Sequence, residues 1–411
     1  MNIRTITLFC DPEFPLSAER LAAAGQAAAA LKQALQDAGY QVQTTRLAGP
    51  PCADVVGGRP EKAMAYAQAL EDLCFVHSLD YASIGPARPS DAPEFYHVIP
   101  EVIGATENIF AAAVIADSAG GVNVSAIRVC AEIIRRCAAL RPDGLGNLRF
   151  AALANVPAGV PFLPAAYHGG GPLAVALGLE SADLAVRACA EAETLAEARA
   201  RLVAALEAEG QRLTSLVKKA AGRLDLAFTG LDFSFAPFPE EARSLGSALE
   251  RLTGARVGEP GALAAAAFLT EALDRAEFKR TGFSGLFLPV LEDAVLAARA
   301  AEGWLSVNDL LLYSAVCGTG LDTVPLPGDL SADALAGILV DVAALALRLD
   351  KPLTARLMPM PDKQAGDPVN FDFPFFASSR VLAVRAAGLG GLLGGAAGFE
   401  LRPRIPPGGR G

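Results

Sequence analysis

The feature of this sequence that most constrains its fold is a regular alternation of short apolar segments with longer helical ones. About ten segments have the pattern of strands, and most are followed by a stretch with helical periodicity. Arg4 to Cys10, for example, is rich in β-branched residues, and Ser17 is placed to cap the helix that follows. Strands that alternate with helices favour a parallel α/β core with right-handed crossovers. A doubly wound sheet and a closed barrel share this pattern, so periodicity alone leaves both open.

Composition limits the class of protein and its partners. Hydrophobic residues make up 52% of the 411 residues and charged residues 19%, so a large core is available. The net charge of −10 argues against nucleic acid or an anionic membrane surface as a partner. Seven cysteines without a C-x-x-C pair fit reduced thiols in a cytoplasmic protein better than a disulfide framework or a zinc site.

The mean hydropathy of +0.34 raises the question of a membrane span. The most apolar long segment, 332–349, has the pattern of a buried helix. It is interrupted by Asp333 and Asp341, and no uncharged run reaches the ~20 residues that a span needs. The first apolar run is also too short for a signal peptide. We therefore expect no membrane partner. Because no linker or break in composition divides the chain, we expect one domain over 1–411, with a glycine-rich tail over 388–411.

The first candidate site is the stretch 313–329. Cys317 lies beside a Gly-Thr-Gly turn, and Asp322 follows it. Such a turn indicates a backbone that needs φ > 0 or passes close to a neighbour. A thiol beside it is a candidate nucleophile. The ordinary alternative is a buried core cysteine at the end of a helix.

Two further motifs carry groups suited to binding or proton transfer. His168, in a Tyr-His-Gly-Gly-Gly run, is a candidate general acid or base, although a lone histidine is more often a structural hydrogen bonder. Ser118, Gly121 and Asn123 belong to a turn that leads from a strand into a helix N-terminus, where free N–H groups favour an anion. The alternative is a simple N-cap turn.

Carboxylates and basic residues suggest two other kinds of site. Glu292, Asp293 and Asp329 are candidate oxygen ligands for a divalent cation such as Mg²⁺, although adjacent carboxylates are usually a solvated helix start. The cofactor otherwise stays open. Arg356 and Lys363 are suited to hold a carboxylate or phosphate, or to pair with Asp322 or Asp329.

These motifs, taken in order, resemble the uncharacterised protein family 0210, also called domain of unknown function 711. The resemblance covers most of the chain and is weakest over 1–90. It rests on several sequence elements, and these elements add Ser234, Ser284 and Gly285 to the candidate ligand-binding residues. The elements are Gly121-Val-Asn123, Phe162 to Gly169, Asp225 to Pro239, Phe283-Ser284-Gly285 to Asp293, and Cys317-Gly-Thr-Gly-Leu-Asp322 to Asp329.

The resemblance implies a closed, mostly parallel α/β barrel of about ten strands with outer helices, like that of pyruvate formate-lyase and anaerobic ribonucleotide reductase. In those enzymes a loop with a catalytic cysteine enters the barrel, which would suit Cys317. Their glycyl radical requires an aromatic residue after a C-terminal glycine, whereas Leu389 follows Gly388 here. The resemblance therefore implies the fold without the radical. It also implies a homodimer.

Three classes of function remain. The first is an enzyme for a small anionic metabolite, with Cys317 as nucleophile, His168 as base and Asp322 nearby. The second is a metal-assisted enzyme, and the third is a non-catalytic metabolite-binding or regulatory protein. Since strand ends in parallel α/β folds gather at one edge, we expect Cys317, His168 and Asn123 to line one pocket, within ~10 Å of one another.

Overall fold

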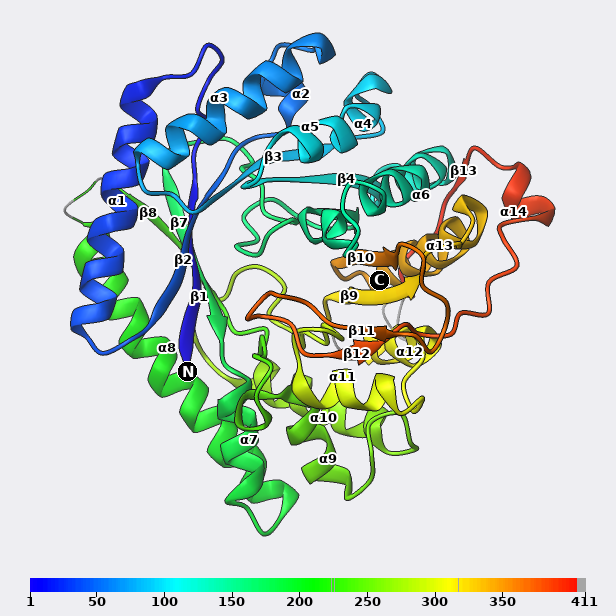
Figure 1. The fold of residues 1–411 in the computed structure, drawn as a ribbon. Coiled ribbons are helices and arrows are strands. Elements are labelled where there is room, and N and C mark those ends of the chain that lie inside the picture. The colour runs from blue at the N-terminus through cyan, green and yellow to red at the C-terminus, as the bar shows by residue number, and fades with distance from the viewer. Residues whose placement is uncertain (223, 225, 317, 405–411) are drawn as a thin grey trace, which may run out of the picture.

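The computed structural model describes residues 1–222, 224, 226–316 and 318–404, and its core is a large β-sheet with helices around the outside (Figure 1). The main strand order is β8-β7-β1-β2-β3-β4-β6-β10-β9. The strands are β1 (Asn2–Phe9), β2 (Val42–Ala48), β3 (Tyr81–Ala87), β4 (Ile109–Asp117), β6 (Phe150–Ala154), β7 (Ala174–Glu180), β8 (Ala227–Asp232), β9 (Gly320–Pro327) and β10 (Leu353–Met360).

Two groups of strands run in opposite directions. Strands β1, β2, β3, β4 and β6 are parallel to one another. Strand β7 is antiparallel to β1, and β10 is antiparallel to β6, while β8 and β9 are parallel to β7 and β10 respectively. The predicted α/β core with a mostly parallel sheet is confirmed. The opposed directions have a consequence for the site, because the carboxyl ends of the two groups lie at opposite edges of the sheet.

The segment 280–290 lies between the two end strands of this order. Leu231 of β8 forms a bridge with Arg280, and Asp322 of β9 forms a bridge with Pro289. The apolar run over 283–290 has the pattern of a strand in the sequence, but in the structure the segment is irregular. Gly282 and Ser284 have φ values of 68° and 41°, which are incompatible with a regular pleated strand.

The helices begin where the sequence places caps. Ser17, Asn123 and Ser331 each accept a backbone N–H with the side chain at the start of a helix. The longer helices are α1 (Ala18–Asp37), α3 (Ala63–Val76), α6 (Val124–Ala138), α7 (Ala182–Ala190), α8 (Leu195–Ala221), α9 (Leu245–Thr253), α10 (Ala262–Arg275), α11 (Ala294–Ala301), α12 (Val307–Val316) and α13 (Ala332–Leu349). The shorter ones are α2 (Cys52–Val55), α4 (Glu94–His97), α5 (Ile99–Ala105) and α14 (Gly391–Gly395). Within the described residues, none of these helices is long and apolar enough to cross a bilayer.

After β10 the chain folds back across the sheet and then runs along its edge. A hairpin of β11 (Pro368–Val369) and β12 (Ser379–Arg380) holds an aromatic loop over 370–378. Near the C-terminus, β13 (Gly398–Phe399) pairs with β5 (Gly121–Asn123), which itself pairs antiparallel with the end of β4. The C-terminal arm therefore covers the turn that follows β4.

The two faces of the sheet have different partners. Alternate residues such as Leu47, Ala82 and Ile109 pack with the helices in the main hydrophobic core. The residues between them, such as Phe110, belong to a separate cluster on the opposite face, which we call the inner face. Side chains on the inner face meet one another and the segments 280–290 and 370–378. The candidate site is built on this face.

Candidate functional site

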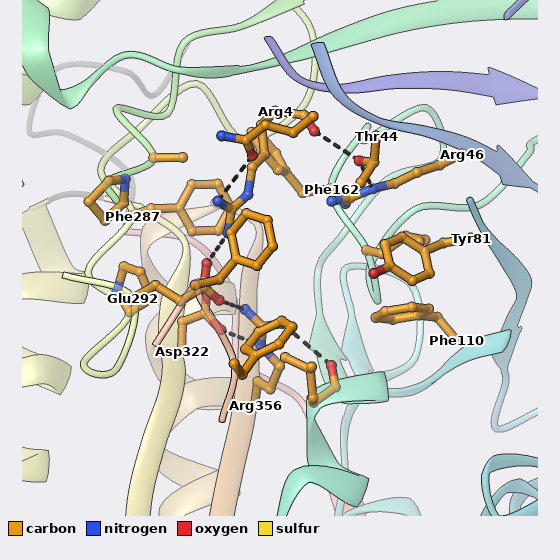
Figure 2. A pocket seen from close by; sticks show the side chains of 18 residues that line it. Arg4, Thr44, Arg46, Tyr81, Phe110, Phe162, Phe287, Glu292, Asp322 and Arg356 are labelled. Atoms are coloured by element: carbon orange, nitrogen blue, oxygen red, sulfur yellow. Dashed lines mark hydrogen bonds and ion pairs between the residues drawn. The ribbon is translucent and has the colours of Figure 1, made fainter. Parts of the chain in front are cut away.

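A cavity of about 90 Å³ lies on the inner face, near the edge where β3, β4 and β6 begin and where β7, β8 and β10 end (Figure 2). Its walls come from strands of both groups and from the segments after β8 and β10. The lining residues are Arg4, Gln43, Thr44, Arg46, Tyr81, Phe110, Leu148, Phe162, Leu163, Ala236, Pro237, Phe287, Pro289, Glu292, Asp322, Arg356, Phe373 and Phe375. We call this set the inner pocket.

Three arginines enter the inner pocket from three strands. Arg4 lies on β1, Arg46 on β2 and Arg356 on β10. Arg4 and Arg356 are charged residues in strands whose other positions are largely buried, and Arg46 lies between the buried residues Thr45 and Leu47 of β2. Arg46 faces the cavity because Leu47, the next residue, points into the helix-packed core.

Arg356 and Arg4 are paired with carboxylates. Arg356 donates from Nε to Asp322 Oδ1 at 2.6 Å and from Nη2 to Glu292 Oε1 at 2.8 Å. Burial alone would lower the pKa of Arg356, but Asp322 and Glu292 raise it above its ordinary value. Arg4 contacts the other oxygen of Glu292 and lies 3.6 Å from Glu180. These two guanidinium groups are therefore compensated.

Arg46 is different, because among the described residues no carboxylate lies within ion-pair distance of it. Its Nε donates to Thr44 Oγ1 at 2.9 Å, and its guanidinium carbon lies 5.8 Å from the centre of the Tyr81 ring. Burial, together with the positive charge of Arg4, lowers the pKa of Arg46 to about 9. At neutral pH the side chain is still protonated, so the inner pocket holds one uncompensated positive charge.

The rest of the wall is mainly aromatic. Tyr81 and Phe110 pack edge to face with their ring centres 5.3 Å apart, and Phe162 and Phe287 do the same at 4.7 Å. Phe375 of the aromatic loop lies under Arg4, with the guanidinium carbon 5.0 Å from its ring centre. The site thus combines a cation with apolar surfaces.

Of the residues that the sequence singles out, Asp322, Glu292 and Arg356 come together in the inner pocket. The pairing of Arg356 with Asp322, one of the two alternatives in the sequence analysis, is what the structure shows. Lys363 is not part of this group, since it is on the surface and donates to the Pro368 carbonyl at 2.8 Å. Cys317 lies outside the described residues.

The three proposed metal ligands do not converge. Asp293 is buried and fully used as a cap: it accepts from Val295 N and Leu296 N at 3.0 Å and from Ser244 Oγ at 2.5 Å. Asp329 is exposed and accepts from Gln364. Within the described part of the chain, no group of three or more His, Cys, Asp or Glu side chains is arranged to hold a metal ion. This corrects the predicted grouping of Glu292 with Asp293 and Asp329.

The predicted convergence of His168 and Asn123 with Cys317 stays a prediction, because Cys317 lies outside the described residues, but neither His168 nor Asn123 lines the inner pocket. His168 packs beside Phe9, its backbone N–H donates to the Gly49 carbonyl, and its Nε2 lies 3.3 Å from the Gly171 oxygen. Both Phe9 and Gly49 mark the carboxyl ends of β1 and β2. The inner pocket lies toward the opposite edge of the sheet, where β3, β4 and β6 begin. Strand β10 ends at that edge because it is antiparallel to β6.

The expected anion site at the start of α6 is occupied by the protein itself. Asn123 caps the helix by accepting from Ala126 N at 2.8 Å. The next two N–H groups, of Val124 and Ser125, both donate to the Ala397 carbonyl of the C-terminal arm. Gly121 is buried in β5, and Ser118 is exposed in the turn before it. This turn is therefore a structural connection with its donors satisfied.

Ser234, Ser284 and Gly285 gather around a buried carboxylate that the sequence analysis does not single out. Asp232 accepts from Ser234 Oγ, from Phe283 N at 2.8 Å and from Ser284 N at 3.0 Å. Burial raises the pKa of Asp232 to about 6. This cluster fastens the segment 280–290 to β8, and none of the three predicted residues lines the inner pocket.

No sequence motif indicates Arg46, Tyr81 or Phe375 as site residues. A usable signal exists for Arg46, which is an arginine within a strand of a sheet that is buried on both faces. Tyr81 lies opposite Arg46 in the β2–β3 register, so pairing of these strands places the two side chains on one face. The aromatic loop carries no signal of its own beyond its four phenylalanines.

Comparison with known sequences supports the resemblance seen in the motifs. Residues 1–377 match the family described as Uncharacterised ACR (DUF711). The chain belongs to this family. All residues that line the inner pocket lie within the range that matches DUF711.

Relatives named UPF0210 protein occur in archaea and bacteria. The chain is 35% identical to one from Pyrobaculum islandicum over 350 residues, which are 80% of this chain and 76% of the relative. It is 32% identical to one from Methanopyrus kandleri over 366 residues, or 84% and 80% of the two chains. A Lacticaseibacillus casei relative is 31% identical over 297 residues, or 70% and 63%.

Proposed function

We propose that this DUF711 protein binds a small anionic metabolite in the inner pocket, with Arg46 as the group that pairs with the negative charge. The observation that carries the proposal is the uncompensated guanidinium of Arg46. Arg46 is half-buried, and holding a charged group partly out of water without a partner costs free energy. A bound anion would supply the missing partner through charge-assisted hydrogen bonds, for which a planar guanidinium is well suited.

The position of the inner pocket supports the same proposal. Ala236 and Pro237 follow β8, and Phe373 and Phe375 follow β10, so these parts of the wall lie beyond the carboxyl ends of their strands. Ligands of parallel α/β sheets bind at such ends. The closed barrel implied by the family resemblance is part of this proposal. It is supported by the segment 280–290, which bridges to both end strands of the sheet.

Calorimetric titration of the full chain with small carboxylates and phosphates tests the proposal. Arg46→Met should weaken binding roughly 10- to 100-fold, since a hydrogen bond to a charged group contributes about 1.5–3 kcal/mol. Circular dichroism should confirm that the variant is folded. A variant that binds the same anions as tightly as wild type would contradict the proposal.

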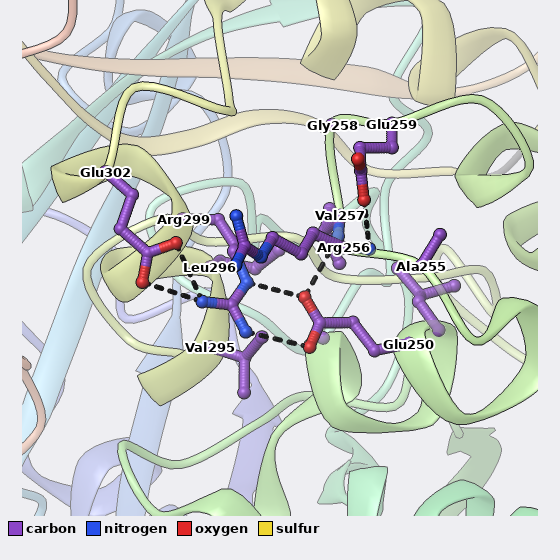
Figure 3. A network of polar contacts seen from close by, with 12 residues as sticks. Glu250, Ala255, Arg256, Val257, Gly258, Glu259, Val295, Leu296, Arg299 and Glu302 are labelled. Atoms are coloured by element: carbon purple, nitrogen blue, oxygen red, sulfur yellow. Dashed lines mark hydrogen bonds and ion pairs between the residues drawn. The ribbon is translucent and has the colours of Figure 1, made fainter.

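Arg299→Met is a matched control for this substitution. Arg299 lies on α11 and donates to Glu250 of α9 at 2.6 and 2.9 Å and to Glu302 (Figure 3). The Arg299→Met substitution removes the same charge as Arg46→Met, but from a paired arginine that does not line the inner pocket. Binding should be unchanged at a temperature where this variant is folded.

A further inference from the structure

We infer that the ligand of the inner pocket is a small monocarboxylate with an apolar body. This inference rests on the proposed function and names the class of ligand. It follows from the charge of the walls, from the residue types that line them and from the size of the cavity.

The charge of the walls matches a single negative charge. Glu180, which contacts Arg4, also pairs with Arg243 and is buried. Arg243 also pairs with the exposed Glu240. The lining of the inner pocket itself contains the guanidinium groups of Arg4, Arg46 and Arg356 and the carboxylates of Glu292 and Asp322. One positive charge remains, on Arg46. A dianion would bring a second negative charge toward Glu292 and Asp322 with no free cation to meet it.

The lining lacks the groups that usually hold a phosphate. Phosphate sites typically use backbone N–H groups of glycine-rich turns or helix N-termini, often with a lysine. Among the described residues that line the inner pocket there is neither a glycine nor a lysine. None of them lies in the first turn of an α-helix. A planar carboxylate, which a single guanidinium binds through two parallel hydrogen bonds, fits this lining better.

The apolar walls and the volume define the rest of the ligand. Figure 2 shows Arg46 and Tyr81 entering the cavity from one side, with Phe162 and Phe287 on the other. A ligand with its carboxylate on Arg46 would place its body against these rings. A volume of about 90 Å³ is more than a few waters need but smaller than the ~150 Å³ of an engineered cavity that binds benzene. A short branched aliphatic acid fits this description, and benzoate, which is larger than benzene, probes its upper limit. A nucleotide or coenzyme A is too large.

The test uses probes that differ in one property at a time. Isovalerate and benzoate carry one charge and an apolar body, acetate lacks the body, and benzamide lacks the charge. Phenyl phosphate at pH 8 and phthalate carry two charges. Each is titrated into wild type, Arg46→Met and Arg299→Met, with saturation-transfer NMR for weak binding.

We expect isovalerate or benzoate to bind wild type and Arg299→Met at least 10-fold more tightly than acetate, benzamide, phthalate or phenyl phosphate. Arg46→Met should lose this preference. If the dianions or acetate bind as tightly as the apolar monocarboxylates in a manner that depends on Arg46, the inference about ligand class is wrong and the proposed function stands. If no probe binds in a manner that depends on Arg46, the proposed function is itself overturned.

Discussion

Arg46 and Arg356 carry the same charge in the same pocket, but they have opposite surroundings. Arg356 is held by Asp322 and Glu292, whereas Arg46 has no carboxylate partner among the described residues. We expect Arg46→Met to leave the free energy of unfolding unchanged or to raise it, because the variant no longer holds an unpaired charge partly out of water. Arg356→Met should lower it by about 3–5 kcal/mol, because two buried carboxylates lose their cation.

Urea unfolding at pH 7 measures both changes. The two variants remove the same charge and introduce the same side chain, so each serves as the control for the other. Equal destabilisation by the two substitutions would show that Arg46 is compensated in the folded protein.

Asp232 predicts a dependence of stability on pH. Burial raises its pKa from 3.8 to about 6, so between these values the folded state keeps a proton that the unfolded state has lost. Its contribution to stability is present below about pH 4 and is lost as the pH rises toward 6, by up to about 3 kcal/mol.

Asp232→Asn removes this titration while it keeps the shape of the side chain. Urea unfolding at several pH values from 4 to 7 should show wild type losing stability relative to the variant as the pH rises. Parallel profiles for the two proteins would mean that the carboxyl group of Asp232 does not titrate in this range.

The cysteines allow a test of the nucleophile hypothesis. The six described cysteines are all buried, and burial raises the pKa of Cys10 and Cys189 to about 11 and of Cys52 to about 12. A buried thiol with a raised pKa reacts slowly. Iodoacetamide at pH 7 should therefore modify Cys317 before any of the six, and mass spectrometry of the digested protein locates the label. Faster labelling of Cys52 would contradict the hypothesis, and Cys317→Ser is the control.

At the scale of elements, the aromatic loop between β11 and β12 forms one wall of the inner pocket. Phe375 contacts Arg4 and also packs against Phe238 and Phe373. Phe371, in the same loop, packs against Phe376 and does not line the cavity. We expect Phe375→Ala to weaken the binding of benzoate several-fold, since a contact between two aromatic rings contributes about 0.5–1.5 kcal/mol beyond the burial of their area.

Phe371→Ala is the matched control, because it removes the same side chain from the same loop without changing the lining. Calorimetry with both variants measures the difference. If both substitutions weaken binding equally, the loop acts through its overall order and Phe375 has no specific contact with the ligand.

At the scale of the whole molecule, the sheet connects distant parts of the chain. Strand β1 pairs with β7, and β6 pairs with β10, so both halves of the sequence contribute to one sheet. The inner pocket uses residues from Arg4 to Phe375. The two halves of the sequence therefore share one main sheet.

The homodimer implied by the family resemblance stays a prediction at this scale. Two exposed apolar pairs, Phe75 with Val76 and Leu392 with Leu393, lie at the end of α3 and in α14. Light scattering at micromolar concentration should give about twice the chain mass of 42.4 kDa. A mass equal to that of one chain would refute the prediction.

The sequence by itself determined most of the local structure. The segment 332–349 is the helix α13, Arg4 to Cys10 overlaps β1, and Ser17 caps α1, all as predicted. These features depend on side chains a few residues apart, which act through periodicity and capping. The motifs also identify the family, because they follow one another along the chain.

The tertiary structure alone decided the site. Strand direction depends on contacts between residues far apart, such as those between β1 and β7, and the periodicity of one strand does not specify its partner. For the same reason the sequence analysis could not show that Ala397 occupies the start of α6. The sequence indicates Asp322, Glu292 and Arg356 as candidates. Whether an arginine lacks a partner, however, depends on which carboxylates lie near it in the folded chain. That is why Arg46, an ordinary residue in the sequence, becomes the centre of the proposed site in the structure.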